Sequence, residues 1–104
     1  MLEEKQQELI NSIHSIEHPE IACTLNELGM IGNIEFDNEE NSISVILNLP
    51  MMTIPIQIRD MLINSIAESL RQKASGTKLK ISLAQMTDEQ RRNFFFLSKQ
   101  NRKV

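Results

Sequence analysis

The chain has 104 residues, 40% of them hydrophobic, and a formal net charge of −3. This length suits one domain with a two-layer core, so we expect residues 1–104 to form a single domain. The negative charge argues against nucleic-acid binding, because counterion release requires Lys and Arg clustered on one face. The chain lacks the apolar run of about 18 residues that a membrane span needs, and its polar, acidic N-terminus is unlike a signal peptide. We therefore predict a cytoplasmic protein with neither a nucleic-acid nor a membrane partner.

Cysteine is present once, at Cys23, which excludes an intramolecular disulfide. Structural zinc sites and iron-sulfur clusters usually take four ligands, with cysteines at characteristic short spacings. The sequence has no such spacing, so we expect no cofactor in the isolated chain. It also lacks a Gly-rich phosphate loop and a nucleophile-elbow motif. We therefore assign no catalytic residues and expect a protein without enzymatic activity.

The first predicted element is an amphipathic helix over residues 2–16, with acids in its first turn, where the helix dipole favours them. Its apolar side is formed by Leu2, Leu9, Ile13 and Ile16. Pro19 ends this helix, because proline cannot continue it. Thr24 then opens one short helical turn by capping towards Glu27, and Gly29 supplies the positive φ that ends the turn.

Two strands with alternating apolar and polar residues follow, at residues 30–36 and 42–49. The all-polar residues 37–41 between them predict a reversing loop, so the strands should form an antiparallel hairpin with one dry face. The inward residues are Gly32, Ile34 and Phe36 in the first strand and Ile43, Val45, Leu47 and Leu49 in the second. Ile46 interrupts the polar face of the second strand. It is either a single exposed apolar residue, which is common, or the contact of a partner or of the C-terminal segment.

Pro55 suits the first position of a long helix over residues 56–75, with Thr53 as a nearby cap and Gly76 as its end. The apolar side of this helix includes Ile58, Met61, Leu62, Ile66 and Leu70. A third alternating strand follows at residues 77–83. Its inward residues are Leu79, Ile81 and Leu83. The strand-helix-strand order predicts a right-handed crossover, so the second and third strands should be parallel unless the first lies between them.

Thr87 and Gln90 form a capping box that opens a C-terminal helix. This helix carries three consecutive phenylalanines, which cannot all face one core because successive residues point about 100° apart. At least one is left for another surface. The predicted fold is α+β, a two-layer sandwich of a three-stranded mixed sheet with helices on one face and a C-terminal helix. The sheet combines an antiparallel hairpin with one crossover strand. Residues 2–84 form the core of the domain, and residues 87–104 form a C-terminal helical extension.

Four segments resemble, in the same order, motifs of one protein family. They are His18-Pro19-Glu20, residues 28–31, residues 47–55 and residues 86–94. In the family, the third segment reads close to Leu-Thr-x-Pro-x-Cys-Pro. The chain thus resembles the iron-sulfur cluster assembly accessory family (metal-sulfur cluster biosynthesis). That family includes small proteins of the PaaD/SufT type and the N-terminal domain of Mrp-type ATPases.

The resemblance implies an α+β domain that helps to assemble or deliver iron-sulfur clusters, beside an iron-sulfur carrier ATPase or a client protein. The family's reactive group is a loop cysteine, and Ile54 occupies its position here. Isoleucine cannot form the thiolate that ligates iron, so an iron-sulfur cluster would be held only transiently or through a partner. We assign no metal ligands. The weak candidates are His18, Glu20 and Cys23, against the simpler interpretations of Glu20 as a solvated acid and of Cys23 as a small buried hydrophobe.

The loop at residues 50–55 offers an apolar set suited to a protein partner, and an exposed phenylalanine would add a second contact. The predicted partner-binding residues are Met51, Met52, Thr53, Ile54 and Phe95. The alternative is that this loop closes the end of the core. The leading interpretation is a non-enzymatic adaptor of iron-sulfur cluster assembly that acts through protein contacts. Two alternatives stay open. One is a plain interaction or dimerisation module that has kept the fold and lost the metal pathway, and such a module could form a homodimer. The other is a small redox or metal enzyme.

Overall fold

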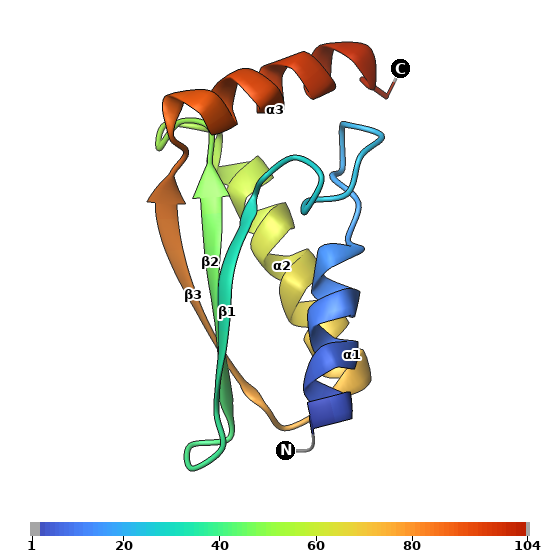
Figure 1. The fold of residues 1–104 in the computed structure, drawn as a ribbon, viewed down its shortest axis with the longest axis vertical. Coiled ribbons are helices and arrows are strands. Elements are labelled where there is room, and N and C mark those ends of the chain that lie inside the picture. Colours follow the sequence, from blue (N-terminus) through green and yellow to red (C-terminus); the bar gives the residue numbers. More distant parts are fainter. Residues whose placement is uncertain (1–2, 104) are drawn as a thin grey trace.

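The computed structural model describes residues 3–103 and has an α+β architecture (Figure 1). The elements in chain order are α1 (Glu3–His14), β1 (Ile31–Asp37), β2 (Ser42–Leu49), α2 (Ile56–Lys73), β3 (Lys78–Gln85) and α3 (Asp88–Gln100). The sheet order is β1-β2-β3, with β1 antiparallel and β3 parallel to β2. This arrangement confirms the predicted mixed sheet and its crossover. Figure 1 shows α1 and α2 on one face of the sheet and α3 across its end.

The hairpin turn between β1 and β2 is held by its own acidic residues. The Asp37 carboxylate accepts hydrogen bonds from the backbone N–H groups of Glu39 (3.0 Å) and Glu40 (3.2 Å). Asn41 takes a positive φ of 52°, a conformation that Asn tolerates better than most residues. These local bonds explain why an all-polar segment reverses the chain here.

The described elements differ from the predicted ones mainly at their ends. α1 ends at His14, and Ile16 follows it as a half-buried residue beside the core. Leu2 lies outside the described residues. Thr24 and Glu27 form the predicted reciprocal cap, and Gly29 has a φ of 74°. No helix in residues 3–103 is long and apolar enough to cross a membrane.

The predicted inward position of Gly32 is wrong. The pairing of β1 with β2 is irregular between Ile31 and Ile34, where two residues of β1 oppose one residue of β2. This bulge turns Gly32 to the outer face of the sheet, where a Cβ built on it would lie 3.0 Å from the Cβ of Ile46. The same contact explains the half-burial of Ile46, because its side chain covers the glycine.

The hydrophobic core lies between the inner face of the sheet and the two helices. Its fully buried members include Leu9 and Ile13 of α1, Ile43, Val45, Leu47 and Leu49 of β2, and Leu62 and Ile66 of α2. β3 contributes less than predicted, since Leu79 and Ile81 are only half-buried and Leu83 is 37% exposed. The physical reason is its position at the edge of the sheet, where it has a neighbouring strand on one side only.

The start of α2 also differs from the prediction. Pro55 is the N-cap residue rather than the first helical residue. Within residues 3–103, no side chain caps the start of this helix, so the predicted cap by Thr53 is wrong. The Pro55 carbonyl accepts hydrogen bonds from the N–H groups of Ile58 and Arg59, both at 3.1 Å. Met61 was predicted to face inward but is 47% exposed, because the buried stripe of α2 runs through Leu62, Ile66 and Leu70. The helix ends at Lys73, three residues before Gly76.

Candidate functional site

An open groove of about 610 Å³ lies at the end of the sheet that α3 crosses. Three segments line it: residues 18–21 after α1, the loop and helix start at residues 50–58, and residues 94–103 of α3 and the chain after it. We call it the apical groove. The lining residues of the last two segments are Pro50, Met51, Ile54, Pro55, Ile58, Phe94, Phe95, Ser98, Arg102 and Lys103.

α3 is held over the sheet at both ends. At its start, the Thr87–Gln90 capping box begins the helix, and the N–H of Met86 just before it donates to the Leu49 carbonyl at the end of β2 (2.8 Å). After its end, the chain pairs with the loop at residues 20–22. Ala22 donates to the Asn101 carbonyl (2.7 Å), and Lys103 donates to the Glu20 carbonyl (3.0 Å). These bonds fix α3 and the chain after it relative to the loop at residues 20–22, so the segments that line the groove keep their relative positions.

The Lys103 side chain makes two further contacts with the chain after α1. Its ammonium group donates to the His18 carbonyl at 3.0 Å and forms an ion pair with Glu17 at 2.7 Å. The side chains of Lys103 and Glu17 are 39% and 59% exposed, so the ion pair itself contributes little to stability. Its effect is on the geometry of the site, because it connects the C-terminal segment to Glu17, next to His18.

His18 is buried, with 4% of its surface exposed. Its Nδ1 accepts a hydrogen bond from the N–H of Glu20 (3.0 Å), and its ring meets the Phe94 ring edge-on, with centroids 6.4 Å apart. Burial lowers the pKa of His18, opposed in part by the charge of Glu20. The accepted hydrogen bond also requires an unprotonated Nδ1. The imidazole is therefore neutral at pH 7 and serves as a wall of the groove.

The three weak metal candidates do not form a ligand set. Cys23 is buried, and burial, together with the negative charges of Glu27 and Glu17, raises the pKa of its thiol. His18 donates its backbone N–H to the Cys23 carbonyl (3.0 Å), while the Glu20 side chain is exposed. In the described part of the chain, no three His, Cys, Asp or Glu residues are placed to hold a metal ion. A protonated, buried thiol is a poor nucleophile and a poor ligand.

The predicted partner-binding residues divide into two groups. Met51, Ile54 and Phe95 line the apical groove, and Met51 and Phe95 are each 46% exposed. Ile54 also packs against the core. Met52 (51% exposed) and Thr53 stand at the surface outside the groove lining. The loop therefore combines the two predicted roles: Ile54 packs against the core, and Met51 and Met52 are exposed to solvent.

The sequence named the segment at residues 94–96 as a second contact without singling out Phe94, and it did not indicate Ile58 or Arg102 as members of the site. Phe94 is the buried member of the phenylalanine run, with Phe95 and Phe96 left exposed, as the helical spacing requires. It lies three or four residues from Arg91, Leu97 and Ser98, which are half-buried on the same side of α3. Arg102 lies beyond any periodic element, so no sequence pattern pointed to it.

No protein-family model matches the sequence, and a search of curated proteins finds no match. Among solved structures, the fold is similar to the crystal structure of a domain of unknown function, DUF59, from Bacillus anthracis. The TM-score is 0.69 over 92% of this chain and 93% of that chain, with 13% sequence identity. At this identity the similarity establishes a shared fold: the chain has the architecture of a DUF59 domain over nearly its whole length.

Proposed function

We propose that this chain is a non-enzymatic adaptor of iron-sulfur cluster assembly or delivery that binds a protein partner through the apical groove. One observation carries the proposal. Two segments that resemble family motifs line the same groove, although they lie far apart in the sequence. They are His18-Pro19-Glu20, which contains two of the weak metal candidates, and the loop at residues 50–55, which contains the position of the family's cysteine. The fold shared with the DUF59 domain supports the resemblance on which the iron-sulfur link rests.

The lining of the groove favours a protein contact over metal chemistry. At the position of the family's cysteine, Ile54 presents a hydrocarbon surface, and Met51 and Phe95 beside it are half exposed. Phenylalanine buries a large apolar area, and the flexible methionine side chain adapts to a partner's shape, so the two suit recognition of an apolar segment. The thiol of Cys23 is buried, so we assign the cluster-ligating role to the partner, a carrier ATPase or a client protein.

The alternative is an interaction module that has kept the fold and lost the metal pathway. It is favoured by the same isoleucine, since an apolar groove serves any hydrophobic partner equally well. The two proposals differ in what a cell loses when the protein is absent. Only an adaptor of cluster assembly affects enzymes that need iron-sulfur clusters.

A deletion strain of the native host tests this difference. We expect the activity of an oxygen-labile iron-sulfur dehydratase, per amount of its polypeptide, to fall, and the activity of a metal-free enzyme to stay constant. The wild-type gene should restore the dehydratase, and Met51→Glu in the groove should not. Met61→Glu is the matched control, because Met61 is similarly exposed (47%) but does not line the groove. Unchanged dehydratase activity in the deletion strain would leave only the interaction module.

A further inference from the structure

β3 presents a strand edge that is open for pairing. Within residues 3–103, this eight-residue strand pairs with β2 alone, and no other hydrogen bond engages the backbone of its second edge. Figure 1 shows no helix or loop beside that edge. Exposed strand edges are templates for pairing with another chain, and proteins normally block them with bulges, charges or covering elements.

The opposite edge of the sheet is blocked in this way. β1 contains the bulge at Gly32, which interrupts regular pairing. It also carries Glu35 and Asp37 on exposed positions, so that self-pairing would bring acids close together. β3 has neither a bulge nor an acidic residue. Its two lysines are the only charged residues on the strand, and one of them is already engaged.

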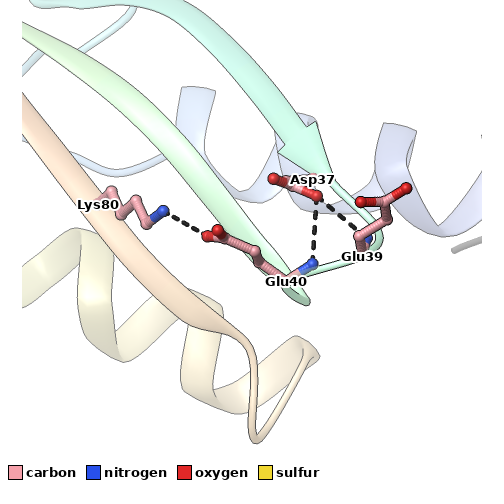
Figure 2. Close-up of polar contacts among 4 residues, drawn as sticks. All are labelled: Asp37, Glu39, Glu40 and Lys80. Carbon is pink, nitrogen blue, oxygen red and sulfur yellow. Dashed lines mark hydrogen bonds and ion pairs between the residues drawn. The ribbon is translucent and has the colours of Figure 1, made fainter.

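Lys80 is directed along the outer face of the sheet, away from the open edge. Its ammonium group forms an ion pair with Glu40 of the hairpin turn at 2.7 Å, as Figure 2 shows. In this conformation, the Lys80 side chain does not project past the edge as an obstacle to a neighbouring strand. Only Lys78, at the first position of the strand, is left to do so.

We propose that two copies of this chain associate through antiparallel pairing of their β3 edges, with Ile81 on the two-fold axis. In this register, Leu79 lies opposite Leu83 of the partner subunit, and Ile81 lies opposite its own copy. On the outer face, Lys80 lies opposite Ser82 of the partner subunit, and Lys78 lies opposite the partner's Ala84. Apolar residues thus meet apolar residues, and each lysine meets a small neutral one.

Other registers are less favourable. A shift by a single residue between strands is excluded, because it would set inner residues opposite outer ones. Centring the pair on Lys80 places two ammonium groups directly opposite each other, which is destabilising. Centring it on Ser82 places Leu79 opposite Gln85. The order of charged and apolar residues along β3 therefore favours the register in which the two strands pair with Ile81 at the centre.

The proposed dimer also accounts for apolar surface that the monomer leaves exposed. Leu83 is 37% exposed on the inner face of β3. Pairing continues the sheet and keeps the helices of both copies on one face. The exposure of Leu83 falls because the partner's Leu79 packs beside it. The proposal does not depend on the function of the apical groove, which lies at the end of the strands and stays open.

Charge substitutions at Ser82 test the register in solution. Ser82 is exposed on the outer face, so Ser82→Lys and Ser82→Glu should fold alike. In sedimentation equilibrium we expect the wild type to form a dimer. Ser82→Lys should raise its dissociation constant roughly 2- to 30-fold, because two like-charge pairs form per dimer, and Ser82→Glu should not raise it. Asn26→Lys and Asn26→Glu, in the exposed turn before β1, are the matched controls and should leave the dimer unchanged.

Cross-linking tests the position of the axis. In a Cys23→Ser background, Ile81→Cys should form an intermolecular disulfide under mild oxidation, because opposed residues of antiparallel strands have Cα atoms about 4.5–5.5 Å apart. Lys78→Cys should not, since its own copy lies six residues along the strand, on the order of 20 Å away. A chain that stays monomeric up to roughly 1 mM overturns the proposal. So does a dimer that responds equally to both Ser82 variants, or equal cross-linking at both cysteine positions.

Discussion

Phe94 is expected to be the main anchor of α3 and hence of the apical groove. Its side chain is 7% exposed, and its ring meets the rings of His18 (6.4 Å) and Phe95 (5.5 Å) edge-on. Phe96 lies two residues later on the same helix and is 57% exposed. Substitution of each by alanine therefore removes the same atoms from opposite environments.

The expected costs differ by several kcal/mol. Truncating a buried phenylalanine to alanine typically costs about 3–5 kcal/mol, and edge-on aromatic contacts contribute about 0.5–1.5 kcal/mol of such effects. Truncating an exposed one stays within roughly 0.5 kcal/mol. A domain of this size has about 5–15 kcal/mol of stability, so Phe94→Ala removes a large fraction while the chain still folds.

Urea unfolding measures this difference. With a slope of about 1–3 kcal/mol per molar urea, a loss of 3 kcal/mol moves the midpoint by roughly 1–3 M, whereas Phe96→Ala should barely move it. Hydrogen exchange of the α3 amides should accelerate in Phe94→Ala alone. A loss below about 1 kcal/mol, or equal losses for the two variants, would show that α3 is held by its ends rather than by this ring.

Four further expectations follow from the site. Met52→Glu should leave the thermal midpoint nearly unchanged, and Ile54→Glu should lower it, because only Ile54 packs on the core and a carboxylate at this partly buried position loses part of its solvation. Thermal scans compare the two variants. The pKa of His18 is lower in the folded than in the unfolded chain, so the unfolded chain takes up a proton at a higher pH, and the free energy of unfolding should fall as the pH drops below about 6.5. His18→Gln should reduce this pH dependence, measured by urea titrations at pH 7.5 and 5.5. Cys23 should react with iodoacetamide far more slowly in the folded chain than in urea, as followed by mass spectrometry. Anaerobic incubation of the purified chain with iron and sulfide should give no cluster absorbance, since one thiol per chain is too few; a stable chromophore abolished by Cys23→Ser would contradict this.

The sequence patterns that predicted the fold correctly are those with a strong local cause. The limits of β2 match its alternation over residues 42–49, because one face of this central strand is wholly buried. The caps at Thr24 and Thr87 form as predicted, since both partners of each cap lie within three residues. In each case the interaction is decided by neighbours along the chain.

The features that the sequence did not predict depend on contacts between distant segments. At the bulge, Ile46 on the neighbouring strand fills the space that a side chain at Gly32 would take. The exposure of Leu83 depends on the position of β3 at the edge of the sheet, which its alternating pattern does not encode. The apical groove joins residues 18–21 to residues 94–103 through backbone pairing, and no short-range motif marks that pairing.

The two proposed surfaces together restrict how an iron-sulfur cluster could be handled. Antiparallel pairing about Ile81 points the two apical grooves in opposite directions, because each groove lies beyond the C-terminal ends of β2 and β3. Each strand extends four residues from the axis to Gln85, so at about 3.3 Å per residue the strand ends alone are on the order of 25 Å apart. A cluster a few ångströms across cannot bridge two such grooves. In this dimer, therefore, thiolate ligands near the groove must come from the bound partner and not from the second copy, and each groove acts on its own.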